Sequence, residues 1–238
     1  MQLKVFWETT KKWAAADLAD FRQSVPKIAE RLRTEQYWNK HGDIKRNRFT
    51  CEDFAIRVLC EYASSKGLPV KLSTDVRTYR NMELYDASQH DRYASNKYGF
   101  SEMVMLTFGA RDIQSNENTK PVTSANALHP GDILAQAKDR PAQVAHHIQL
   151  VYARSNSQID IYQGNSGAGN WASPFFRLFK HNPANPRDSQ YTGQLVEIGK
   201  YTRVPPGWTY ENMTTGKKYK NKLAEFEFYR WNFEGFNK

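Results

Sequence analysis

The clearest hydrophobic pattern in the chain covers residues 48–69. Apolar side chains recur there at three- and four-residue spacing, the period of one helix face. Thr50 is a good N-cap, Asp53 stands where a capping box places an acid, and Gly67 marks the stop. The pattern predicts a helix with Cys51 in its first turn and with this buried stripe: Phe54, Ala55, Val58, Leu59, Tyr62 and Ala63.

Two further segments are helical in pattern. Residues 14–34 predict helical structure with a fresh start near Ser24 and Pro26, because proline fits a first turn but not later turns. Residues 101–108 are ambiguous between helix and strand, and the glycine that follows favours a short helix. Residues 81–98 mix polar and aromatic side chains and predict an irregular excursion.

The second half of the chain alternates as strands do. A Pro-Gly turn leads into a strand within residues 129–136, and residues 145–153 and 158–164 predict a hairpin. Further strands are expected near 193–198 and 225–231. Helices first and strands later predict an α+β fold, in which the N-terminal helices pack on an antiparallel sheet.

Length and composition limit the possible architectures. The chain has 238 residues without a repeat, a low-complexity tract or a Gly/Ser linker, so we expect one domain over residues 1–238. Hydrophobic residues make up 39% and aromatic residues 13%, which separates the chain from disordered sequences of similar polarity.

Net charge and hydropathy indicate the surroundings in which the protein acts. The net charge of +9 favours anionic surroundings such as nucleic acid, anionic lipid or bacterial cell wall, although a solvated basic surface explains it equally well. No apolar stretch approaches the roughly 20 residues of a membrane span, and residues 1–13 lack the apolar run of a secretory signal. We expect a protein that reaches any extracellular target without a cleaved signal peptide.

The two cysteines differ in their expected surroundings. Cys51 and Cys60 lie roughly 13 Å apart along one helix, so they cannot pair there and should be free thiols. The helix N-terminus favours the thiolate of Cys51, while Glu52 and Asp53 partly oppose it. Cys51 is therefore the candidate nucleophile, against the alternative that it merely packs, and Cys60 is expected in the core.

Two adjacent histidines compete for the role of base. His146 and His147 open a strand, whereas the other histidines stand in polar or proline-flanked loops. Alternation puts His147 on one face with Gln149 and Val151, and His146 on the other. We favour His147, with His146 as the alternative.

A catalytic imidazole needs a polar partner that fixes its tautomer. The returning strand offers Gln163 and Asp160, with Asn165 just beyond. We favour Gln163, because it lies closest to the level of His147 if the hairpin turns tightly at residues 154–157. Asp160 is the alternative third residue, because a slip of one residue in the strand register would exchange the two.

An oxyanion needs hydrogen-bond donors. The backbone amide of Cys51 can supply one, and the side chain of Asn47 is a second candidate. The sequence has no HExxH motif and no cysteine-pair zinc pattern, so we expect neither a metal nor a cofactor.

These features in this order resemble the papain-like cell-wall hydrolases, the NlpC-type endopeptidases and the related CHAP amidases. In that group a cysteine starts a helix, a Gly-Asp strand follows, then a strand that begins with histidine, then a polar residue on the next strand. The family commonly has Asp-Cys-Ser where this chain has Thr50-Cys51-Glu52. The matching pieces span about half of the chain: 49–54, 131–134, 147–152 and 163–165.

The resemblance implies a papain-like core over residues 49–165, with an N-terminal helical part (1–48) and C-terminal strands and loops (166–238). It implies a cysteine peptidase or amidase that cuts an amide bond in peptidoglycan peptides through a thioester. A basic protein of this kind fits an antibacterial effector toxin that acts in the periplasm of a target cell. Such an effector implies a secretion-system carrier and an immunity protein.

Two rival functions remain at this stage. The same site could serve a protease, deamidase or acyltransferase toxin with a cytosolic protein target. A nucleic-acid-binding module would use aromatic side chains such as Tyr93, Tyr98, Tyr219 and Trp231 for stacking on bases. We rank it last, because the basic groups at 45–48 and 217–222 are short.

Overall fold

The computed structural model describes residues 2–38, 41–85, 93–165 and 193–238. Within these ranges the chain forms four α-helices and three short 3-10 helices: α1 (Ala15–Thr34), α2 (Cys51–Lys66), α4 (Lys97–Val104), α6 (Phe233–Phe236), η1 (Ala110–Gln114), η2 (Ala125–Ala127) and η4 (Lys222–Glu225).

An antiparallel sheet forms the other half of the architecture. Eight strands from the described ranges make it, in the order β13 (Lys218–Lys220), β12 (Gly207–Asn212), β11 (Glu197–Val204), β10 (Gln158–Gln163), β9 (His147–Arg154), β8 (Ile133–Gln136), β14 (Phe226–Trp231) and β7 (Thr119–Pro121). Smaller antiparallel pairs are β1 (Gln2–Val5) with β6 (Met82–Tyr85), β2 (Gln36–Trp38) with β3 (Ile44–Arg46), and β4 (Lys71–Ser73) with β5 (Thr78–Arg80).

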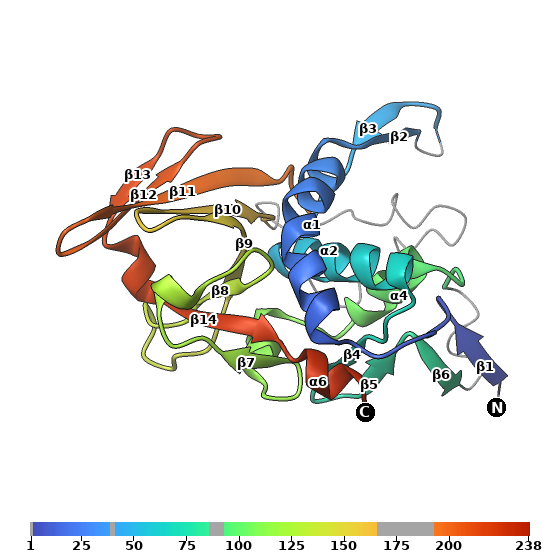
Figure 1. Cartoon of the computed structure of the whole chain (residues 1–238). Coiled ribbons are helices and arrows are strands. Elements are labelled where there is room, and N and C mark those ends of the chain that lie inside the picture. The colour runs from blue at the N-terminus through green and yellow to red at the C-terminus, as the bar shows by residue number, and fades with distance from the viewer. Residues whose placement is uncertain (1, 39–40, 86–92, 166–192) are drawn as a thin grey trace.

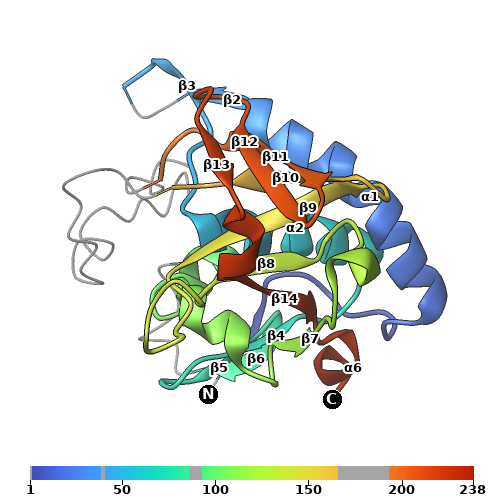
Figure 2. The same cartoon turned by 90° about the vertical axis from the view of Figure 1, so that its left-hand side faces the viewer.

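The expected α+β class is confirmed. Figure 1 shows α1 and α2 beside the sheet, and the turned view of Figure 2 shows strands β8 to β13 in front of these helices. Helix α2 packs against both α1 and β9, so its first turn lies at the junction of helices and sheet.

Helix α1 corrects one expectation. It is continuous from Ala15 to Thr34 with Pro26 inside it, so the second start near Ser24 is wrong. Proline removes a backbone hydrogen bond and strains the preceding turn. The burial of one apolar stripe on both sides of the proline opposes that cost: Phe21, Val25, Ala29 and Leu32.

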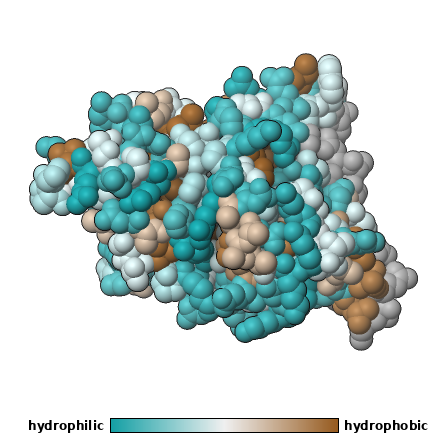
Figure 3. All heavy atoms as spheres, in the orientation of Figure 1, coloured by the Kyte–Doolittle hydropathy of each residue, from teal (hydrophilic) through white to brown (hydrophobic). Residues whose placement is uncertain are grey.

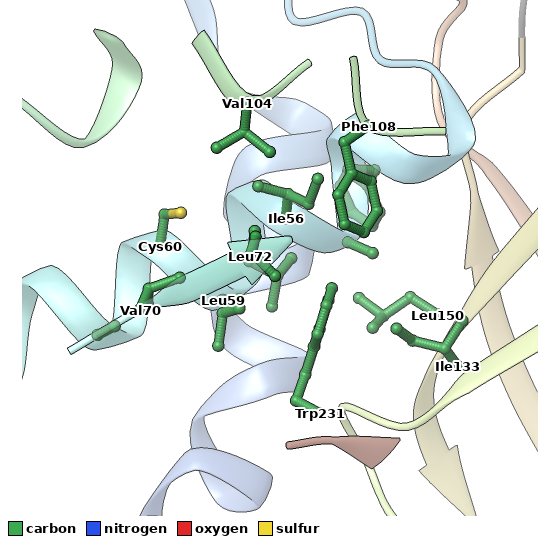
Figure 4. Close-up of a cluster of buried hydrophobic side chains, with 14 of the residues drawn as sticks. Ile56, Leu59, Cys60, Val70, Leu72, Val104, Phe108, Ile133, Leu150 and Trp231 are labelled. Carbon is green, nitrogen blue, oxygen red and sulfur yellow. The ribbon is translucent and has the colours of Figure 1, made fainter. Parts of the chain in front are cut away.

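Each face of the sheet has its own apolar cluster. On the helix side, Ile148 and Leu150 of β9 join a large core that includes Trp231 and side chains of α2 (Figure 4). On the other side, Val151 and Ile161 join a smaller cluster around Tyr201. The central strands are therefore covered on both faces along most of their length.

Several segments differ from their expected bounds. The short helix expected at 101–108 begins earlier, as α4, because the Asn96 side chain accepts hydrogen bonds from the N–H groups of its first turn. The stretch 81–98, expected to be irregular, contains strand β6, and its residues 86–92 lie outside the described residues. The same holds for 166–192, which include most of the glycine-rich loop after the hairpin.

The surface drawn in Figure 3 is mostly hydrophilic, in keeping with the mean hydropathy of −0.77. Exposed apolar side chains include Leu3 and Leu84, which oppose each other on the β1–β6 pair. None of the helices within the described ranges combines the length and the apolar composition that a bilayer span requires.

Candidate active site

The first turn of α2 places Cys51 at the start of the helix. The Thr50 hydroxyl accepts a hydrogen bond from the Asp53 N–H at 3.4 Å, and Gly67 ends the helix in the left-handed conformation, with φ 62°. The helix expected from these capping residues is confirmed. The Cys51 N–H is one of the first helix amides, which have no partner within the helix.

The Cys51 thiol lies between its own helix and strand β9. It donates a hydrogen bond to Oε2 of Glu52 at 2.8 Å, and backbone N–H groups of Ile148 and Glu52 point at the sulfur. Burial raises the pKa of Cys51 well above its ordinary value, the Glu52 carboxylate raises it further, and the two N–H groups oppose the shift. These effects outweigh the helix N-terminus, so the thiol is protonated at rest.

Gly164 lets the end of β10 pack closely against Phe49 and Thr50, the two residues before Cys51. A Cβ on Gly164 would collide with the carbonyl oxygens of Thr50 and Phe49, so only glycine fits this approach. Phe49 also forms a β-bridge with Gln194. The segment just before the candidate nucleophile is thus held by the residue directly after Gln163.

The hairpin of β9 and β10 brings Gln163 to His147. Nε2 of His147 lies 3.3 Å from Oε1 of Gln163. An irregularity between Asp160 and Ile161 shifts the register, and Asp160 lies opposite Ala153, far along β9 from His147. Asp160 instead accepts hydrogen bonds from Gln158, so of the two expected third residues the structure brings Gln163 to the histidine.

A residue that the sequence pattern did not indicate fixes the orientation of this glutamine. Nε2 of Gln163 donates to Oε2 of Glu197 on β11 at 2.7 Å. An ionised carboxylate only accepts hydrogen bonds, so the amide must turn its Oε1 toward His147 and toward Nε2 of Gln149, which donates at 2.7 Å. Asn212 on β12 also donates to Glu197, at 2.7 Å.

This chain of hydrogen bonds assigns the tautomer of His147. Because Oε1 of Gln163 accepts, Nε2 of the imidazole carries the proton and Nδ1 keeps its lone pair. Burial lowers the pKa of His147, against a smaller raising effect of the Gln163 hydrogen bond. The imidazole is therefore neutral near pH 7, with one nitrogen available as a base.

The thiol and the imidazole both lie at the start of β9, but they hold different partners and no hydrogen bond joins them. The sulfur contacts the N–H of Ile148, the residue after His147, and Cys51 packs against the larger core on the α2 side of the strand. His147 lies on the opposite face, with Gln149. In this resting arrangement the thiol bonds to Glu52 and the imidazole to Gln163, so proton transfer between them requires the thiol to leave Glu52 and the two side chains to come into contact.

The remaining candidates have structural partners. Nε2 of His146 lies 3.1 Å from Asp139. The side-chain amide of Asn47 donates to the Leu32 carbonyl and to Glu35, both at 3.1 Å, which uses its two N–H groups and does not support a role for it at the oxyanion.

The Gly-Asp segment and the second cysteine are also structural. Gly131 has φ 94°, a turn conformation that favours glycine, and Asp132 accepts from the His129 N–H and from Arg230. Cys60 is 1% exposed within the core, as expected (Figure 4), and burial raises its pKa. Both cysteines are free thiols.

The described residues contain no group of three or more His, Cys, Asp or Glu side chains arranged to hold a metal ion. Tyr93 and Trp231, two of the aromatics considered for base stacking, are buried. Comparison of the chain with protein-family models, with curated proteins and with solved structures finds no match.

Proposed function

We propose that the protein is a papain-like cysteine hydrolase that cleaves an amide bond in peptidoglycan peptides, with Cys51 as nucleophile and His147 as base. The observation that carries the proposal is the hydrogen-bond series His147–Gln163–Glu197, which leaves Nδ1 of a neutral imidazole unprotonated on the residue directly before Ile148, whose backbone amide contacts the Cys51 sulfur.

In the proposed reaction, the Cys51 proton passes to Nδ1 of His147 as the sulfur attacks the amide carbon. The oxyanion is stabilised by N–H groups at the start of α2, among them that of Cys51. The C–N bond breaks as His147 returns the proton to the leaving amine, which leaves a thioester. Water, deprotonated by His147, then releases the carboxylic acid and restores the thiol.

The Cys51 thiol and the His147 imidazole are both neutral at rest, which suits a proton transfer that begins only when substrate binds. The raised pKa of Cys51 keeps the thiol protonated and resistant to adventitious oxidation, and the lowered pKa of His147 keeps the imidazole unprotonated. Displacement of Glu52 by the substrate would free the thiol for His147.

The cell-wall substrate is supported by the net charge of +9, which favours an anionic polymer, together with the motif order of the sequence. On this proposal the protein is an antibacterial effector that acts in the periplasm. A protease, deamidase or acyltransferase with a cytosolic target is the rival that the same catalytic residues allow.

The test is expression of the wild type, Cys51→Ala and Cys60→Ala in a bacterium, each with and without an added periplasmic signal, followed by mass analysis of muropeptides. We expect lysis and new fragments with periplasmic wild type and Cys60→Ala only, and a loss of at least about 1,000-fold in fragment release for Cys51→Ala. Toxicity confined to the cytosol would favour the rival target. Toxicity that Cys51→Ala retains would overturn the catalytic proposal.

A further inference from the structure

A polar cavity of about 290 Å³ opens beside His147, on the face of the sheet opposite α2. Its wall includes His147, Gln163 and Glu197, so one side of it is the hydrogen-bond chain that orients the histidine. The other lining residues come from β8, β9, β12, β13 and η4, from Asn165 just after β10 and from the turn between β12 and β13, all of them within the described ranges. Cys51 is not among them.

One buried polar group in this cavity lacks a partner. The ring of Tyr210 is 4% exposed, and its hydroxyl lies toward Asn212 without completing a hydrogen bond to any described residue. Burial of a hydroxyl without a partner is unfavourable, and such groups are normally satisfied. The Tyr210 hydroxyl is therefore an open hydrogen-bonding position for a bound molecule.

The cavity also offers one charge of each sign. Glu197 uses only Oε2 for Gln163 and Asn212, and its Oε1 has no hydrogen bond within the described part of the chain. At the rim, Lys222 is neutralised by an ion pair with Glu225. Lys217 has no such pair among the described residues.

We propose that this cavity is a recognition pocket for a zwitterionic end group, an ammonium and a carboxylate on the same carbon. The ammonium binds Oε1 of Glu197, the carboxylate binds Lys217, and the Tyr210 hydroxyl completes the contacts. The volume suits a single amino-acid end group. A simple anion site would not place a carboxylate in the wall, and a simple cation site would not place an unpaired lysine at the rim.

The assignment of this end group to the substrate rests on the proposed function. Because the pocket shares His147 and Gln163 with the catalytic site, a bound end group would belong to a residue close to the bond that is cut. Glu197 then has two roles, since its Oε2 positions Gln163 while its Oε1 faces the ligand.

The binding test uses the full-length Cys51→Ala protein, which separates binding from hydrolysis. Three probes of similar length are titrated by NMR: diaminopimelate, with zwitterionic ends; pimelate, with carboxylates only; and cadaverine, with amines only. We expect diaminopimelate to bind at least about tenfold more tightly than either analogue, because each analogue leaves one charged group of the pocket unpaired.

Two variants and a matched control sharpen the test. Lys217→Gln should weaken diaminopimelate binding about tenfold, and Tyr210→Phe severalfold. Lys218→Gln should leave it unchanged, because Lys218 is 70% exposed and pairs with Glu211 outside the cavity. Equal binding of pimelate or cadaverine, no binding of diaminopimelate in the millimolar range, or equal loss in the control overturns the proposal.

The two proposals can fail separately. If diaminopimelate binds as expected but the wild type releases no muropeptides, the pocket stands and the hydrolase does not. If muropeptides are released in a Cys51-dependent manner while none of the probes binds, the hydrolase stands and the zwitterion pocket is wrong.

Discussion

The two faces of strands β9 and β10 are built differently. The face toward α2 is apolar at the start of β9, where Ile148 and Leu150 pack into the larger core. The opposite face is polar at the same level, where His147, Gln149 and Gln163 form hydrogen bonds. Further along, this second face becomes apolar and joins the smaller cluster.

Adjacent residues of β9 therefore have different roles: those on one face stabilise the fold, and those on the other hold the candidate catalytic groups. The helix face contributes burial energy and places the Cys51 sulfur against the strand backbone. The polar end of the other face holds one histidine tautomer and lines the cavity. Substitutions on the two faces should therefore affect different measurements.

The largest effect is expected from the helix-face core. Trp231 is 2% exposed, and Trp231→Ala should lower the free energy of unfolding by about 3–5 kcal/mol, because it removes a large buried side chain and leaves a cavity. Chemical denaturation measures this. Tyr219→Ala is the control on the cavity side: Tyr219 is 47% exposed, and a cost near that of Trp231→Ala would contradict the division of roles.

Glu197→Gln tests the series of hydrogen bonds that sets the tautomer of His147. A glutamine can donate as well as accept, so Gln163 is free to flip and His147 loses its single tautomer. We expect activity to fall about 100-fold, within the range of general base catalysis, with a change of less than about 1 kcal/mol in unfolding free energy. Histidine nitrogen shifts in NMR should show a mixture of tautomers, and an unchanged spectrum would remove the positioning role.

Glu52→Gln tests what holds the thiol at rest. The substitution removes a negative charge beside the sulfur, so the pKa of Cys51 should fall and alkylation by iodoacetamide at pH 7 should become severalfold faster. Asp53→Asn, one residue further on, is the control, and it should leave the alkylation rate of Cys51 unchanged. A rate unchanged by Glu52→Gln would mean that burial alone keeps the thiol protonated.

The smallest effect is a pH dependence of stability. Burial lowers the pKa of His147 in the folded protein below its ordinary value of 6.5, so the unfolded chain binds more protons in the interval between the two values. Unfolding free energy should therefore fall as the pH drops through that interval and should be fully present above 6.5. The difference between wild type and His147→Gln isolates this contribution, and parallel profiles would show that His147 is not buried in its neutral form.

Local signals allowed the sequence to predict some parts of this arrangement. Thr50 and Gly67 cap α2 through contacts within a few residues, so its bounds were predictable. Gln163 was favoured over Asp160 on the assumption of a tight turn, and the irregularity after Asp160 that settles the register leaves no clear trace in the sequence.

Other parts depend on long-range contacts. Glu197 reaches Gln163 only through the pairing of β10 with β11, and 166–192 separate those strands in the chain. A carboxylate within the strand expected near 193–198 was the only available signal. Pro26 was expected to start a helix, because the packing that keeps α1 continuous lies on other elements.

The most direct test of the central claim is a search for the thioester on Cys51. Purified protein is mixed with isolated sacculi, quenched in acid within one turnover, digested and analysed by mass spectrometry. The account predicts a muropeptide acyl group on the peptide that contains Cys51, its loss on addition of hydroxylamine, and none on the Cys60 peptide. Release of the same fragments by Cys51→Ala, with no adduct in the wild type, would contradict it.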